Sequence, residues 1–173
     1  ELEVSMNDNK FTRHVTPEKD KVSFKHKMAY GIGNIASGFM GNGVMQLSQV
    51  VYNVGLGVNP ALVALAQSIP RFWEALTDPI MGSVTDNHRS RFGRRKPFIA
   101  LGAILTGILF AVVFSVPRGW GQHAYFYYFL ITSIFYYTAY TIFVVPFGAM
   151  GFELTPDYHE RTRVQAFAQY LLN

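Results

Sequence analysis

One apolar segment of the chain, residues 61–85, carries ionisable side chains in its middle. Gln67, Arg71, Glu74 and Asp78 are spaced 4, 3 and 4 residues apart, so in a helix they lie along one side. A charge at the centre of a membrane-spanning helix costs about 2.5–3.5 kcal/mol. Two carboxylates one turn apart also repel each other unless a cation or a proton lies between them. The spacing therefore predicts a cation site at Glu74 and Asp78, which would be metal ligands if the ion is Na⁺.

The same residues also allow a purely structural interpretation. Arg71, Glu74 and Asp78 could form a buried network that only fixes how the helix packs against its neighbours. One arginine leaves one of the two carboxylates without a counter-charge, which favours the cation site over this alternative.

Amide side chains recur along one side of the apolar segment 29–54, within an arc of about 60° if the segment is helical. Such a face suits either interhelical hydrogen bonds or the wall of a polar cavity, and the sequence leaves both open. We expect a cavity that also receives one cation and one tyrosine from neighbouring segments. The predicted substrate-lining residues are Asn42, Gln46, Gln49, Arg71 and Tyr140.

The chain has 173 residues, of which 50% are hydrophobic and 15% are charged, and it contains no cysteine. This composition excludes a disordered chain, a disulfide-stapled domain and a cysteine-ligated metal module. Neither a Ser/His/Asp arrangement nor a phosphate-binding glycine loop is present, so no enzyme is indicated.

The basic residues occupy the polar segments between the apolar stretches. Thirteen of the 15 Lys and Arg residues lie in 1–28, 86–97 and 153–165. The positive-inside rule then places the N-terminus and these segments in the cytoplasm. A nucleic-acid patch at 86–97 is disfavoured, because the segment lies between two apolar stretches and has no aromatic platform.

Four apolar stretches are each long enough to cross a membrane, and a fifth begins near the end of the chain. We therefore expect an all-α transmembrane fold, preceded by a polar cytoplasmic segment at 1–28. The expected spans are residues 29–54, 61–85, 97–117, 123–151 and the start of a span at 164–173.

A longer motif runs from the charged stripe into the next basic segment. Residues 74–97 read E-A-L-T-D-P-I-M-G-S-V-T-D-N-H-R-S-R-F-G-R-R-K-P. This order of a carboxylate, Asp-Pro-x-x-Gly, Asp and Ser-Arg-x-Gly-Arg-Arg-Lys-Pro resembles the glycoside–pentoside–hexuronide cation symporters, a branch of the major facilitator superfamily. Weaker similarity extends the resemblance over roughly residues 27–173.

The resemblance implies a twelve-helix transporter, of which this chain would supply the N-terminal part of the helix bundle. It also implies a site for Na⁺ or H⁺ at Glu74 and Asp78, aided by Thr141 with Thr77 nearby. The segment 86–97 resembles the superfamily's cytoplasmic gating loop, in which an Asp–Arg pair holds one conformation closed. The corresponding residues are Gly82, Asp86, Arg91, Gly93 and Arg94. For the loop cations, contact with the membrane surface is the alternative.

These observations together predict a cation-coupled symporter of a glycoside, a uronide or another small polar solute in a bacterial inner membrane. Its expected partners are that solute, the lipid bilayer and the C-terminal half of the same transporter, with no nucleic acid. No cofactor is expected besides the coupling ion. Two alternatives remain open: a non-transporting membrane sensor on the same scaffold, and a lysolipid-type symporter.

Overall fold

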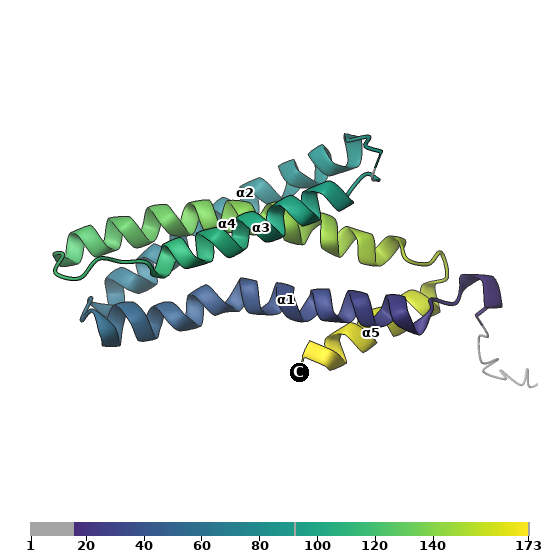
Figure 1. The fold of residues 1–173 in the computed structure, drawn as a ribbon, viewed down its shortest axis with the longest axis horizontal. Helices are drawn as coiled ribbons and strands as arrows, with labels where there is room; N and C mark the ends of the chain where they lie inside the picture. Colours follow the sequence, from purple (N-terminus) through teal and green to yellow (C-terminus); the bar gives the residue numbers. More distant parts are fainter. Residues whose placement is uncertain (1–15, 92, 173) are drawn as a thin grey trace, which may run out of the picture.

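The computed structural model describes residues 16–91 and 93–172, and every regular element in these ranges is helical (Figure 1). A short 3₁₀ turn, η1, leads into five α-helices, and a π-helical segment, η2, directly follows the first. The elements are η1 (Glu18–Asp20), α1 (Phe24–Ser48), η2 (Gln49–Gly55), α2 (Pro60–Asn87), α3 (Lys96–Phe114), α4 (Gln122–Glu153) and α5 (Tyr158–Leu172).

The helices extend further into the polar segments than the hydropathy pattern indicates. Helix α1 begins at Phe24, inside the expected polar segment 1–28, of which residues 1–15 lie outside the described ranges. Helix α5 begins at Tyr158 rather than near Val164. Its first turn is helical because the Asp157 side chain accepts a hydrogen bond from the backbone N–H of Glu160, a capping contact that hydropathy does not register.

Two of the helices, α3 and α4, are long and apolar enough to cross a membrane by length and composition. Helices α1 and α2 contain amides and charges within comparable lengths. The larger number of membrane spans expected from the sequence therefore stays a prediction.

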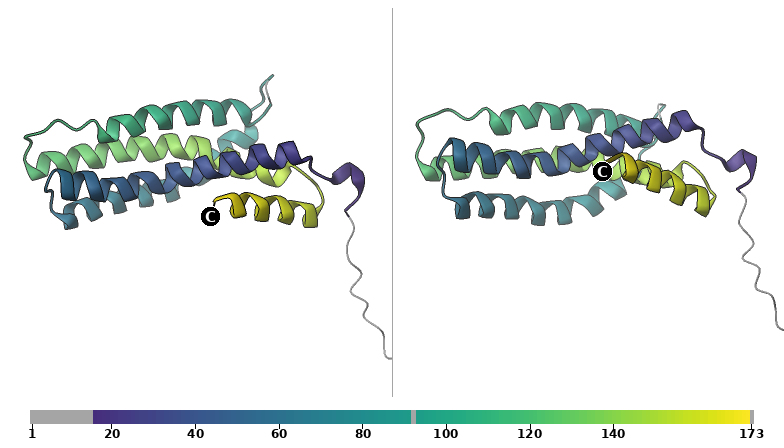
Figure 2. Two further views of the ribbon diagram at one scale, coloured as in Figure 1. Left: turned by 60° about the horizontal axis from the view of Figure 1, so that its bottom comes forward. Right: turned by 90° about the horizontal axis from the view of Figure 1, so that it is seen from below.

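Helix α4 packs between α2 and α3, whereas α5 packs against α1. Figure 2 shows α1 to α4 running side by side along the long direction of the molecule, with the shorter α5 beside the first half of α1. This arrangement brings α1, α2 and α4, which carry the polar side chains, next to one another.

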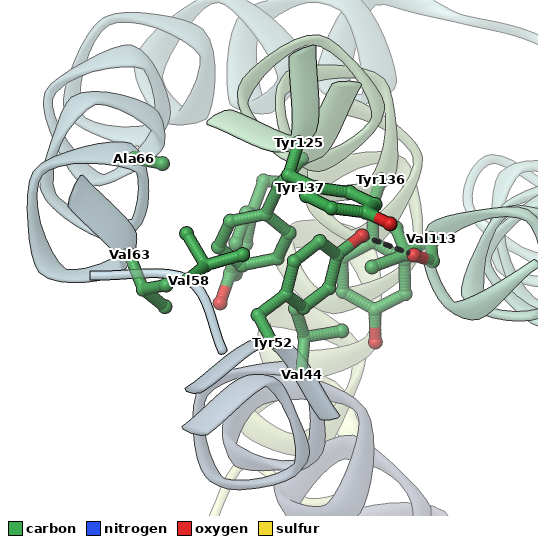
Figure 3. Close-up of a cluster of buried hydrophobic side chains, with 10 residues drawn as sticks. Val44, Tyr52, Val58, Val63, Ala66, Val113, Tyr125, Tyr136 and Tyr137 are labelled. Carbon is green, nitrogen blue, oxygen red and sulfur yellow. Dashed lines mark hydrogen bonds between the residues drawn. The ribbon is translucent and has the colours of Figure 1, made fainter. Parts of the chain in front are cut away.

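A cluster of buried tyrosines and valines joins the helices where α2 begins and α3 ends (Figure 3). The hydroxyl of Tyr52, fully buried in η2, donates to the carbonyl of Val113 at 2.6 Å. From α4, the hydroxyl of Tyr136 donates to the carbonyl of Met40 in α1, also at 2.6 Å. These bonds satisfy phenol groups in an apolar setting, and so fix α1, α3 and α4 relative to one another.

Helices α1 and α4 approach closely at Gly41. A Cβ atom at this position would lie 2.7 Å from the Tyr140 hydroxyl oxygen, which is closer than non-bonded atoms come. Glycine at this position therefore lets Tyr140 reach α1, where its hydroxyl lies 3.3 Å from the carbonyl oxygen of Ser37.

Candidate cation and solute site

The centre of the site is a contact between α2 and α4. The Thr141 hydroxyl donates to the Asp78 carboxylate with an Oγ1–Oδ1 distance of 2.9 Å. Thr141 is buried, with 1% of its surface exposed, and Asp78 is partly buried. Among the described residues, no basic side chain pairs with Asp78. Across the helix interface its carboxylate contacts the Thr141 hydroxyl instead.

Glu74, one turn earlier on α2, has a cation partner. Arg71 Nη1 lies 2.9 Å from Glu74 Oε2, and 13% of the Glu74 side chain is exposed against 45% of that of Arg71. The guanidinium also lies over the Tyr137 ring, 4.9 Å from its centroid, where cation–π attraction adds to the ion pair. Arg71 Nη2 reaches the carbonyl of Gly41 at 3.4 Å. The arginine is thus held between α1, α2 and α4.

Two further polar side chains of this region serve other contacts. The Thr77 hydroxyl donates to the carbonyls of its own helix, at Trp73 and Glu74, and is not joined to the carboxylate pair. The Trp73 indole N–H donates to the Thr138 hydroxyl of α4 at 2.9 Å. This tryptophan was not singled out from the sequence, and it ties α2 to α4 one turn from the Asp78–Thr141 contact.

The central residues carry one net negative charge. Arg71 pairs with Glu74, and the Asp78 carboxylate accepts a hydrogen bond from the Thr141 hydroxyl. Carboxylate and hydroxyl oxygens are ligands for hard cations such as Na⁺, and a carboxylate is equally a proton acceptor. The arrangement is suited to binding one monovalent cation or one proton.

The structure separates the predicted substrate-lining residues into two groups. Gln49 and Arg71 line a hollow of about 320 Å³ between α1 and α2. Asn42 and Gln46 line a different hollow of about 350 Å³, closed on one side by Leu172 of α5. The two hollows share no lining residue, so within the described residues the amides border two separate hollows. The common substrate cavity expected from the sequence stays a prediction.

Tyr140, the remaining member of the predicted set, packs against α1 at Ser37 and Gly41. Gln67, which the helical spacing places on the charged stripe, lies in the hollow with Arg71. It accepts from Gln49 at 3.3 Å and donates to the carbonyl of Met45 at 3.0 Å. A bridge of amides therefore links α1 to α2 directly beside the arginine.

The segment after α2 forms an ion-pair network, with partners that differ from those expected. Asp86 pairs with Arg95 at 2.7 Å, and Arg95 also contacts Glu153, at the end of α4, at 3.0 Å. Arg94 pairs with Glu153 at 2.5 Å. The hydrogen bond from Arg95 lowers the pKa of Asp86, which keeps this carboxylate ionised. Arg95 and Glu153 are the members that the sequence analysis did not identify.

The other three predicted loop residues have simpler settings. Gly93 has a φ of +98°, a backbone conformation that favours glycine, and it turns the chain into α3. A Cβ atom on Gly82 would lie 3.9 Å from Val145 of α4, an ordinary packing distance. Arg91 lines a hollow at the start of α3 with Lys96 and Pro97.

A second ion-pair cluster connects the beginnings of α1 and α5. Glu160 is buried, with 2% of its surface exposed, and lies 2.6 Å from Lys27 Nζ. It also accepts from the backbone N–H of Val22 at 3.2 Å and contacts Arg163 at 3.4 Å. The hydrogen bond from Lys27 is the main cause that lowers the pKa of Glu160. The ionised carboxylate thereby fastens the chain before α1 to α5.

A bundle of long helices, two of which are apolar enough to cross a membrane, with charged side chains of α2 inside it, fits the class of membrane transporters. Residues 29–173 match the family described as MFS/sugar transport protein. The chain belongs to this family, which confirms the resemblance to the glycoside–pentoside–hexuronide cation symporters. Its members are transporters, not enzymes.

Three relatives from Escherichia coli illustrate the similarity. The chain is 32% identical over 151 residues to YagG, which is a glycoside/cation symporter by name, covering 87% of the chain and 33% of YagG. It is 29% identical over 154 residues to the inner membrane symporter YicJ, covering 87% of the chain and 32% of YicJ. A glucuronide carrier protein homologue is 24% identical over 147 residues, or 84% of the chain and 32% of that protein. The chain spans about a third of the length of these relatives.

Proposed function

We propose that this chain forms the N-terminal part of a cation-coupled symporter, whose remaining helices lie outside this sequence. The solute would be a glycoside, a uronide or a related polar molecule, as the names of the relatives suggest. The observation that carries the proposal is the contact of Asp78 with Thr141, one turn from Glu74, between α2 and α4. It offers a coupling ion three oxygen-bearing side chains and one uncompensated negative charge.

Coupling would follow from the cost of burying that charge. An empty Asp78 carries its charge into the bundle at a free-energy cost, and a bound cation or proton removes it. The solute-loaded, closed state is then reached more easily with the ion bound, which is the condition for symport by alternating access. The ion is Na⁺ or H⁺, since both satisfy the same oxygens.

The proposed orientation puts the N-terminus and the network of Asp86, Arg95 and Glu153 in the cytoplasm of a bacterial cell, in its inner membrane. Breaking these ion pairs would be needed for the bundle to open on that side. The hollow beside Arg71 would then lie toward the opposite face.

The proposal is tested by uptake in proteoliposomes that contain the full-length transporter, with Asp78→Asn compared against wild type. We expect the substitution to abolish cation-stimulated uptake, because asparagine has neither the charge nor the proton affinity. His123→Gln, at the far end of α4, is the matched control and should leave uptake unchanged. Cation-stimulated uptake that persists in Asp78→Asn would overturn the assignment, and solute binding without flux would favour a sensor.

A further inference from the structure

Two basic residues near the start of α3 lie outside the ion-pair network of Asp86 and Glu153. Arg91 and Lys96 line a hollow of about 540 Å³. No acidic side chain in the described ranges pairs with either of them, whereas Arg94 and Arg95 both contact carboxylates. The hollow therefore carries two positive charges for which the described part of the chain offers no counter-charge.

The remainder of this hollow is apolar and continues onto an exposed side of α3. Its other described lining residues are Pro97 and Ala100. Leu101, Ile104 and Ile108 follow Pro97 at spacings of 4, 3 and 4 residues, so they share its side of the helix, and each is more than half exposed. In both views of Figure 2, α3 lies at the edge of the bundle, where it packs against α4.

The length of the exposed stripe fits one leaflet of a bilayer. From Lys96 to Ile108 the helix rises about 18 Å, and the hydrocarbon region of one leaflet is about 15 Å thick, half of the bilayer core. Helix α3 is also one of the two helices that are apolar enough to cross a membrane. A phosphate at the two basic side chains would thus lie at the membrane surface, with an acyl chain against the stripe.

From this arrangement we infer that the start of α3 is a binding site for an anionic phospholipid. The headgroup phosphate binds Arg91 and Lys96 through charge-assisted hydrogen bonds, and an acyl chain covers the exposed side of α3. A zwitterionic lipid is bound less well, because its own cationic group offsets the phosphate and is repelled by the two basic side chains. This site requires α3 to be in the membrane, but it requires neither a solute nor a coupling ion.

The bound lipid would also hold the segment between α2 and α3 in place. Arg94 and Arg95 lie between Arg91 and Lys96 in the sequence, so a lipid that contacts both outer residues restricts the two inner ones. The ion pairs of the inner arginines with Glu153 are then kept together. Binding of the lipid should therefore raise the melting temperature of the transporter.

The test uses two lipids that have the same acyl chains and different headgroups. Native mass spectrometry of the purified full-length transporter in detergent measures the binding of dioleoylphosphatidylglycerol and of dioleoylphosphatidylcholine. We expect wild type to bind the anionic lipid at least about tenfold more tightly, and to melt at a higher temperature in its presence. The double variant Arg91→Gln/Lys96→Gln should lose both effects, whereas Arg91→Lys/Lys96→Arg should keep them because both charges remain. Inorganic phosphate should not raise the melting temperature, since it has no acyl chain.

The matched control is Lys19→Gln/Lys25→Gln, which removes two exposed positive charges near the start of α1, also on the side proposed to be cytoplasmic. It should keep the full preference for the anionic lipid. Equal losses in the two glutamine double variants would overturn the inference, because attraction to overall surface charge would then explain the binding. Equal binding of both lipids by wild type would also overturn it. None of these measurements involves uptake, so either result leaves the proposed function standing.

Discussion

The carboxylates at the ends of α2 and α4 and at the start of α5 are stabilised in a different way from those in the middle of α2. Asp86, Glu153 and Glu160 each lie between 2.5 and 2.7 Å from the nitrogen of a lysine or arginine. Asp78 instead meets the Thr141 hydroxyl. Glu74 is intermediate, because its partner Arg71 is on its own helix and nearly half exposed.

Under the proposed function, this difference separates carboxylates that hold the structure together from one that can exchange its partner. Asp86, Glu153 and Glu160 have counter-charges within the described residues. No basic side chain of the described residues pairs with Asp78, and the proposed function makes the coupling ion its counter-charge. The predictions below test this contrast, from the largest expected effect to the smallest.

The largest effect should follow from removing the buried carboxylate Glu160 at the start of α5. Glu160→Gln leaves Lys27 facing an amide in a buried position, and we expect it to lower the free energy of unfolding by about 3–5 kcal/mol. Glu153→Gln removes a carboxylate that is half exposed, and should cost about 0–1 kcal/mol. Thermal unfolding of both variants in detergent measures the difference. Equal shifts in melting temperature would show that burial does not distinguish the two pairs.

A smaller effect is expected at the hydroxyl that contacts Asp78. Thr141→Val keeps the side-chain shape and removes one hydrogen bond to a carboxylate, worth about 1.5–3 kcal/mol. The cation concentration for half-maximal uptake should rise about tenfold or more. Thr138→Val is the matched control, since that hydroxyl accepts from Trp73 rather than contacting Asp78. A larger rise in Thr138→Val than in Thr141→Val would place the ion elsewhere.

Glu74 should matter less than Asp78 when the solute is neutral. In Glu74→Gln the arginine loses a partly exposed ion pair worth about 0.2–1 kcal/mol, while Asp78 and Thr141 remain. We expect cation-stimulated uptake of a neutral glycoside to persist, with its half-maximal cation concentration changed by no more than about fivefold. Complete loss of stimulation would mean that both carboxylates are direct ligands at all times.

The same Glu160 carboxylate also predicts a dependence of stability on pH, because protonation removes the charge that Glu160→Gln removes. The pKa of Glu160 is lowered from its usual 4.5 by the hydrogen bond from Lys27, so the folded state favours the ionised form. This contribution is fully present above pH 4.5 and is lost as the pH falls through the lower pKa of the folded state. The melting-temperature difference between wild type and Glu160→Gln should therefore be constant from about pH 7 to pH 5 and shrink below. A difference that grows on acidification would contradict this assignment.

The charged stripe could be anticipated because helical spacing alone puts Arg71, Glu74 and Asp78 on one side of α2. The hollows that the amides border could not, because they depend on how α2 and α5 pack beside α1. Gln49 lines the hollow beside Arg71 of α2, whereas Asn42 and Gln46 line the one that also includes Leu172 of α5. These neighbours are far away in the sequence, so the local spacing of the amides does not reveal them.

The sequence predicts an Asp–Arg pair in the segment after α2, but it does not predict which arginine pairs with Asp86. The sequence has four basic residues within three positions of Gly93, and each could reach Asp86 in some loop conformation. The left-handed turn at Gly93 and the position of Glu153, some 60 residues away, decide that Arg95 does so. The local sequence around Gly93 does not reveal this contact, because it depends on how α4 packs against α3.

The most direct test of the central claim is to count bound ions and find the residue on which they depend. Calorimetric titration of the full-length transporter with NaCl counts bound Na⁺, and a potentiometric pH titration counts bound H⁺. Repeating both measurements in the variants identifies the residue. We predict one ion per transporter in wild type and in Glu74→Gln, and none in Asp78→Asn. Normal ion binding in Asp78→Asn, or its loss in Glu74→Gln alone, would contradict the assignment of Asp78 as the exchangeable site.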